Sequence, residues 1–277
     1  MGLITAIAFA ANSVLNRAAL EAELIDPSLF SLIRIASAAI VLAIILALRG
    51  DFAIPFGGHW KSSIFLVIYV FGFSIAYSFV TSATGALILF ATVQFVMIGS
   101  GYLKGLRLNL LEWGGILVSF IGFLLLLLPG IDSPPTVGLL LMIVSGFGWA
   151  LFSLSGLESR DALYDVGVGF IKATPIALVL SLIFVSHWHV SSIGVLLALA
   201  SGVLASGLGY CIWYLMLPLI TSATAAVFQL LVPVIVAVLG VLILGEAFSS
   251  RLILAGGLVI LGLALYTLAK NLKQRPN

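Results

Sequence analysis

The sequence predicts an all-α integral membrane protein in which ten transmembrane helices form two inverted five-helix repeats around a central cavity. Its composition, a duplicated motif and the placement of its basic residues predict this. Hydrophobic residues make up 62% of the 277 residues and charged residues 8%, whereas a soluble domain carries about 25% charge. Continuous apolar runs also exclude a membrane β-barrel, whose strands alternate polar and apolar residues.

A tetrapeptide, Thr-Ser-Ala-Thr, occurs at Thr81–Thr84 and again at Thr221–Thr224, 140 residues later. The same offset relates two pairs of glycines, Gly105 with Gly245 and Gly122 with Gly262. The chain is therefore predicted to contain two copies of one membrane-embedded unit, an organisation typical of transporters.

Breaks at charged residues, prolines and glycines predict ten spans of about 20 apolar residues each. We expect them at 2–20, 28–48, 62–80, 83–103, 110–129, 136–156, 166–186, 191–215, 222–244 and 252–269. Consecutive prolines cannot continue a helix, so residues 131–135 are the predicted linker between a first repeat, 1–130, and a second, 136–277. Because five is odd, the second repeat must enter the membrane upside down.

The basic residues predict the orientation of the chain. Of twelve Lys and Arg residues, eight fall on the side of both chain ends: Arg49, Lys61, Lys104, Arg107, Arg160, Lys270, Lys273 and Arg275. Only Arg251 lies in a loop on the opposite side, and three lie within or near the ends of spans. Basic residues favour the cytoplasmic side, so we expect a multi-pass protein of the cytoplasmic (inner) membrane with both termini in the cytoplasm.

Polar and aromatic side chains inside the spans are the candidate binding residues, because a polar group in hydrocarbon needs a partner or a wet cavity. The first span carries a stripe of amides on one helical face, and further amides and aromatic residues occupy other spans. The candidates are Asn12, Asn16, Tyr77, Gln94, Trp149, Ser153, Tyr210 and Gln229. They fit the wall of a central cavity for a small amphipathic solute; the alternative is that they hydrogen-bond helix to helix.

Two basic residues, Arg34 and Lys172, lie about seven residues inside their spans. They either extend to the membrane surface or pair with nearby acids, or one of them attracts a solute carboxylate. In inverted repeats they would lie near opposite membrane faces.

The sequence lacks the residues that several other classes of membrane protein require. All ten acidic residues fall in loops or at span ends, which argues against an intramembrane proton relay. No phosphate-binding glycine loop precedes Lys61, and His187 and His189 lack the spacing of a metal site. We therefore expect no enzyme activity, cofactor, metal, nucleic-acid partner or obligate protein partner.

Several segments resemble the drug/metabolite transporter superfamily, in its EamA-like group of ten-span permeases. The matching pieces are Pro27 to Arg34, Thr84 to Gln94, Thr221 to Pro233, Gly245-Glu246, Gly256-Gly257 and Gly262, and together they span the chain. The resemblance implies two inverted repeats around a cavity lined by spans one, three, four, six, eight and nine.

The resemblance also implies a function. We expect a secondary transporter that moves a small metabolite by alternating access, with an amino acid or related zwitterion, exported, as the leading substrate. The alternatives are a transporter for another metabolite or a drug, and a non-transporting membrane scaffold or channel-like subunit. In the second half Glu246 stands where the first half has Leu106, so the two halves are not interchangeable.

Overall fold

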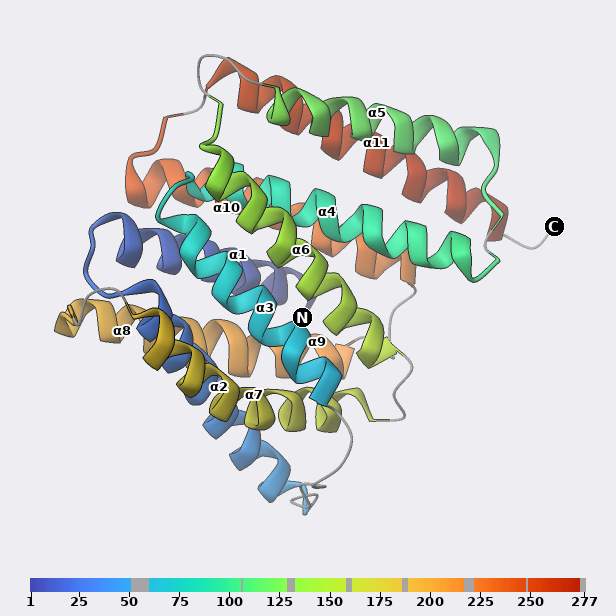
Figure 1. The fold of residues 1–277 in the computed structure, drawn as a ribbon. Helices are drawn as coiled ribbons and strands as arrows, with labels where there is room; N and C mark the ends of the chain where they lie inside the picture. Colours follow the sequence, from blue (N-terminus) through green and yellow to red (C-terminus); the bar gives the residue numbers. More distant parts are fainter. Residues whose placement is uncertain are drawn as a thin grey trace.

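The protein is described by a computed structural model, which covers residues 1–50, 60–105, 107–128, 133–157, 161–185, 189–216, 222–247 and 249–274. Its helices, shown in Figure 1, are α1 (Gly2–Glu21), α2 (Pro27–Leu48), α3 (Trp60–Tyr77), α4 (Ser82–Leu103), α5 (Leu110–Leu127), α6 (Thr136–Leu157), α7 (Ala162–Phe184), α8 (Ser192–Ala200), η1 (Ser201–Leu208), α9 (Gly209–Met216), α10 (Ser222–Leu244) and α11 (Ser250–Gln274). Within these ranges the fold is all-helical, as predicted.

The ten predicted spans are all found as apolar helices. In the described part of the chain, eight helical segments are long and apolar enough to cross a membrane, and Leu110–Leu126 and Leu231–Leu244 are shorter apolar stretches. The eighth span, Ser192–Met216, is continuous although its middle is a π-helix.

Local sequence signals start the helices where they are observed. The Asp26 side chain accepts a hydrogen bond from the Ser28 N–H, and Pro27 occupies the first turn of α2, where a missing N–H costs nothing. Thr81, the first residue of the duplicated tetrapeptide, caps α4 by accepting from the Thr84 N–H. At α5, Asn109 and Glu112 form a reciprocal capping box, which satisfies two backbone donors at once.

The glycines that recur 140 residues apart serve the same local purpose in both halves. Gly105 follows α4 with φ +93°, and Gly245 follows α10 with φ +66°. Both values lie in the left-handed region that glycine adopts most readily at the end of a helix. The repeat in the sequence is thus a repeat of helix-ending geometry.

A second recurring pair, Gly122 and Gly262, brings α5 and α11 together. The two helices lie side by side in Figure 1, and a methyl group added at Gly262 would approach the backbone nitrogen of Ser119 to 2.3 Å. At Gly122 it would come within 2.7 Å of the Ala255 carbonyl oxygen. Contact at such range requires glycine, as in other tightly packed membrane helices.

The packing of the other helices follows the correspondence between the halves. Under the repeat, α1 corresponds to α6, α2 to α7, α3 to the α8–η1–α9 span, and α4 to α10. α3 packs on α6, as α1 packs on α8, η1 and α9; α4 packs on α6, as α10 packs on α1. α2 packs on its own counterpart α7. Each half therefore buries its helices mainly against the other half.

Candidate functional site

A small cavity lies where both halves meet. Its walls come from α1, α3, α4, α6 and α9, which are five of the six spans that the resemblance implied. The lining residues are Phe9, Asn12, Ser13, Tyr69, Phe73, Leu89, Phe90, Trp149 and Tyr210. Only ≈ 10 Å³ of it admits the centre of a water molecule, enough for roughly one water. Small-molecule pockets usually reach about 300 Å³, so the cavity as observed is too small to hold a metabolite.

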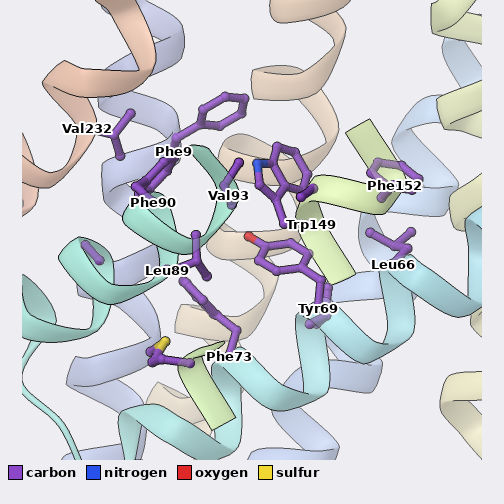
Figure 2. Close-up of a cluster of buried hydrophobic side chains, with 14 of the residues drawn as sticks. Phe9, Leu66, Tyr69, Phe73, Leu89, Phe90, Val93, Trp149, Phe152 and Val232 are labelled. Carbon is purple, nitrogen blue, oxygen red and sulfur yellow. The ribbon is translucent and has the colours of Figure 1, made fainter. Parts of the chain in front are cut away.

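Aromatic rings fill the cavity. The ring of Trp149 lies 5.0 Å from Tyr69, 5.1 Å from Tyr210 and 6.0 Å from Phe9, measured between centroids. Figure 2 shows Trp149 beside Tyr69, with Phe73 and Leu89 on the same side of the cluster. Ring pairs at these separations attract one another. The apolar part of a solute that entered between these rings would be surrounded by aromatic surface.

Polar groups line one side of the same cavity. The Asn12 side-chain oxygen accepts hydrogen bonds from the hydroxyls of Ser201 at 2.7 Å and Ser206 at 3.4 Å. Both serines belong to the π-helix η1, in which residues five apart are hydrogen-bonded neighbours. The π-helix therefore lets two serines reach one amide oxygen. π-Helical turns occur frequently at functional sites.

Asn16 lies one turn beyond Asn12 and continues its stripe, as the spacing predicted. Its amide nitrogen donates to the Asn12 backbone carbonyl at 2.8 Å, and its oxygen accepts from the Ser74 hydroxyl at 2.8 Å. Both asparagines are buried. Asn16 thus joins α1 to α3 outside the cavity wall, as the alternative of helix-to-helix bonding foresaw.

Four further candidates also lie outside the wall of this small cavity. Tyr77 is fully buried and donates to the Ser82 carbonyl at 3.3 Å. Ser153 donates to the Trp149 carbonyl of its own helix at 2.8 Å. Gln94 on α4 and Gln229 on α10 are half-buried. The structure thus brings Asn12, Trp149 and Tyr210 together, and leaves five of the eight candidates around them.

The sequence analysis missed Tyr69 and Phe73, which form one wall of the cavity. The signal that reveals them is a row of aromatic residues at four-residue spacing on α3: Tyr69, Phe73 and Tyr77. Residues four apart share a helical face, and the ring centroids of successive members lie 5.5 Å and 4.7 Å apart in tilted and edge-to-face contacts. Phe9, which was not among the predicted site residues, also lines the cavity.

Arg34 does not make the surface or acidic contacts that its position in the sequence suggested. It is 0% exposed, with hydrogen bonds from Nε to the Ser206 hydroxyl at 3.0 Å and from Nη2 to the Tyr69 hydroxyl at 2.9 Å. No acidic side chain of the described residues contacts it. Asp26, the nearest acid in sequence, accepts hydrogen bonds from Ser28 at the start of α2. Arg34 therefore neither extends to the surface nor forms an ion pair.

One end of the bundle is held by a partly buried charge cluster, which we call the Glu246 cluster: Arg17, Glu21, Ser82 and Glu246. The Glu246 carboxylate accepts from the Ser82 N–H at 2.8 and 3.0 Å, from its hydroxyl at 2.6 Å, and from Arg17 Nε at 3.3 Å. Arg17 also pairs with Glu21 at 2.6 Å and donates to the Tyr77 carbonyl at 2.9 Å. A carboxylate at the N-terminus of α4 gains from the helix dipole. The cluster joins the end of α10 to α1, α3 and α4.

A second ion pair joins the halves at the opposite ends of the helices. Arg49, just after α2, pairs with Asp161, the cap of α7, at 2.7 Å. Burial raises the pKa of Asp161, but hydrogen bonds from the Tyr164 N–H and from Arg49 outweigh it, so the pKa lies below 3.8. Both side chains are more than a third exposed, and exposed pairs stabilise weakly.

The described residues contain no cluster of side chains suited to bind a metal ion. Among the described residues, no three His, Cys, Asp or Glu side chains gather closely enough to bind a metal ion. The chemistry that the cavity offers is hydrogen bonding by an amide and hydroxyls, together with aromatic contact.

Known proteins share this sequence and this fold. An uncharacterized protein of Pseudomonas aeruginosa is 41% identical over 263 residues, covering 95% of this chain and 92% of that protein. An uncharacterized transporter of Archaeoglobus fulgidus is 28% identical over 77% of this chain and 78% of its own length. The uncharacterized transporter YoaV of Bacillus subtilis is 24% identical over 88% of both.

A solved crystal structure matches with a TM-score of 0.66 over 96% of this chain and 97% of that chain. At 21% identity, this similarity supports the fold alone. The model of the EamA-like transporter family matches residues 136–268, the part of the chain in which the sequence predicts the second repeat. With its apolar helices, its near-complete match to the Pseudomonas protein and its transporter relatives, the chain belongs to the EamA-like transporter family, whose members are membrane transporters rather than enzymes.

Proposed function

We propose that this protein is a secondary transporter of the cytoplasmic membrane that exports a small metabolite, with an amino acid or related zwitterion as its substrate. The observation that carries the proposal is the small cavity between the halves, which Asn12, Trp149 and Tyr210 line together. An amide can bind the polar head of such a solute, and the rings can pack on its apolar part.

In this proposal, residues 1–130 and 136–277 are inverted repeats joined by the linker 131–135, and they alternate access to the cavity. α1 ends at the Glu246 cluster, whereas α6 begins near it, because Ser133, Pro134 and Pro135 share a surface depression with Thr81 and Ala247. We place the Glu246 cluster on the outer side and both termini in the cytoplasm, following the distribution of basic residues.

The remaining candidates enter the site when the cavity opens. Gln94 and Gln229 occupy α4 and α10, helices that pack on each other. Pro233 lies within α10 and removes one of its internal hydrogen bonds. A movement of α10 relative to α4 would bring both amides toward the solute, and Tyr77, Asn16 and Ser153 would border the enlarged space.

Transport by purified protein in liposomes tests the proposal. Liposomes loaded with single amino acids are assayed for exchange against labelled substrate, for the native protein, Trp149→Ala and Asn12→Ala. We expect each variant to lose about tenfold or more in rate. Trp113→Ala is the matched control, because Trp113 is 48% exposed on α5, remote from the cavity, and its loss should leave transport unchanged.

A second candidate function is a non-transporting scaffold or channel-like subunit. Two observations favour it: the side-chain oxygens of Asn16 and Asn12 accept hydrogen bonds from other helices, and the cavity has room for about one water. A scaffold predicts no exchange of any amino acid, metabolite or drug in the panel, together with normal folding of Trp149→Ala. Measurable exchange that Trp149→Ala abolishes and Trp113→Ala preserves would reject it.

A further inference from the structure

Arg34 is a cation deep inside the bundle. It lies seven residues beyond Pro27, the first residue of α2, and therefore about 10 Å along the helix at 1.5 Å per residue. It is the largest side chain among those with almost no exposed surface. An arginine at this depth is costly and usually faces a substrate path or an ionic partner.

The buried charge of the Arg34 guanidinium is only partly stabilised by its neighbours. Its Nε and Nη2 atoms bind two hydroxyls, and its carbon lies 5.3 Å from the Tyr69 ring centre and 5.1 Å from that of Phe73. Its Nη1 atom is buried and has no hydrogen-bond partner among the described residues. Cation–π contacts and neutral hydroxyls stabilise the charge in part, but a buried donor without a partner remains costly.

The positive charge lies directly behind the cavity wall. Tyr69 and Phe73, which cover it, line the cavity. Ser206, which accepts from its Nε, also donates to Asn12 on the same wall. Tyr69 and Phe73 are thus the side chains that separate the guanidinium from the cavity.

No acidic side chain of the cavity lining balances the charge of Arg34. None of the nine lining residues is acidic, so an ammonium group finds no charged partner there. Arginine presents donors in a planar fork that fits both oxygens of a carboxylate. The charge balance of the site thus favours anions over cations.

We propose that Arg34 binds the carboxylate of the transported solute, and that the solute is an apolar amino acid recognised as an acid. The proposal rests on the transport function above. The carboxylate replaces the Tyr69 hydroxyl at Nη2 and supplies the missing partner of Nη1, while the apolar side chain packs against Trp149 and Tyr210. Cationic amines that lack a carboxylate, including amine drugs, are disfavoured because no negative group of their own offsets their like charge beside Arg34.

The test compares acids with their amides in equilibrium binding to detergent-solubilised full-length protein. Phenylalanine and leucine are titrated against phenylalaninamide and leucinamide, with thermal stabilisation or tryptophan fluorescence as the readout. The native protein should bind each acid about 30-fold or more tightly than its amide, the scale of a lost buried charge pair. Arg34→Gln should abolish this preference.

Two further variants make the result specific. Arg34→Lys keeps the charge but loses the fork, so it should retain the preference with about tenfold weaker binding of the acids. Lys172→Gln is the matched control: Lys172 is the corresponding buried cation of the second half, over the Trp60 ring at 5.2 Å, and its loss should leave the ratio unchanged. If Arg34→Gln unfolds, the Arg34→Lys measurement alone decides.

The outcomes separate the two proposals. Equal binding of acid and amide by the native protein, or an unchanged ratio in Arg34→Gln, overturns the role of Arg34 even if liposomes show transport. Preferential acid binding that depends on Arg34, without exchange in liposomes, supports Arg34 and rejects the transport function. Absence of binding by all four probes overturns the inference for apolar amino acids.

Discussion

The two ends of the bundle hold the halves together in different ways. At one end, Arg17 and Glu246 are 11% and 9% exposed, and the carboxylate is also bonded to the backbone and hydroxyl of Ser82. At the other end, Arg49 and Asp161 are 39% and 40% exposed. The first connection is a largely buried hydrogen-bonded network, although Glu21 at its edge is 50% exposed, and the second is a surface ion pair.

The repeat explains why the ends differ. Applying the offsets of the two halves, Arg17 corresponds to Ser155 and Glu246 to Leu106. Neither of these residues is charged, so the Glu246 cluster has no ionic counterpart in the other half. The two ends are therefore joined by different interactions, and we expect that separating the helices at one end costs a different free energy from separating them at the other.

Removing the charge of Glu246 should have the largest effect. Glu246→Gln leaves Arg17 buried with less compensation and weakens the cap of α4, so we expect a loss of about 3 kcal/mol in unfolding free energy. Chemical unfolding in detergent micelles measures it. Asp161→Asn is the control at the other end, and a loss as small as that of the control would show that the Glu246 cluster is not the stronger connection.

Removing both charges should be milder than the sum of the single changes. In Arg17→Gln combined with Glu246→Gln, no uncompensated charge remains between α1 and α10. We expect a coupling of about 1–3 kcal/mol in a double-mutant cycle. Strict additivity of the two losses would contradict direct coupling between the side chains across the 3.3 Å contact.

The smallest effect is expected at Asp161. Because the folded-state pKa of Asp161 is lowered from 3.8, its contribution is present at pH values above 3.8 and disappears as the pH falls through the folded pKa. For an exposed pair this contribution is below about 1 kcal/mol. The difference in unfolding free energy between the native protein and Asp161→Asn should become smaller as the pH is lowered from 7 to 3. A difference that grows toward acid would contradict a lowered pKa of Asp161.

The sequence predicted the helices better than their ends, for a physical reason. Hydropathy reports the apolar layer, not the helix, so the seventh span was expected from residue 166 although α7 begins at Ala162. The four extra residues are helical because Asp161 caps the Tyr164 N–H. The third span was expected to reach residue 80, but α3 ends at Tyr77, since the chain must turn before the cap at Thr81.

The site was predicted less completely. Asn12, Trp149 and Tyr210 were found because polar or amphipathic residues inside lipid are informative. Tyr69 and Phe73 escaped because aromatic residues also fill ordinary cores, and how a helix rotates against its neighbours is absent from its own pattern. The isolation of Arg34 could not be inferred either, because only the fold reveals that Asp26 is engaged at the start of α2.

The glycine contact between α5 and α11 has a mechanical consequence. Where backbones touch with no side chains between them, there is nothing to repack, so neither helix can slide past the other without a clash. Because α5 comes from the first half and α11 from the second, this contact holds the two halves together. An alanine at Gly122 or Gly262 would have to push the two backbones apart, so we expect either substitution to weaken this contact between the halves.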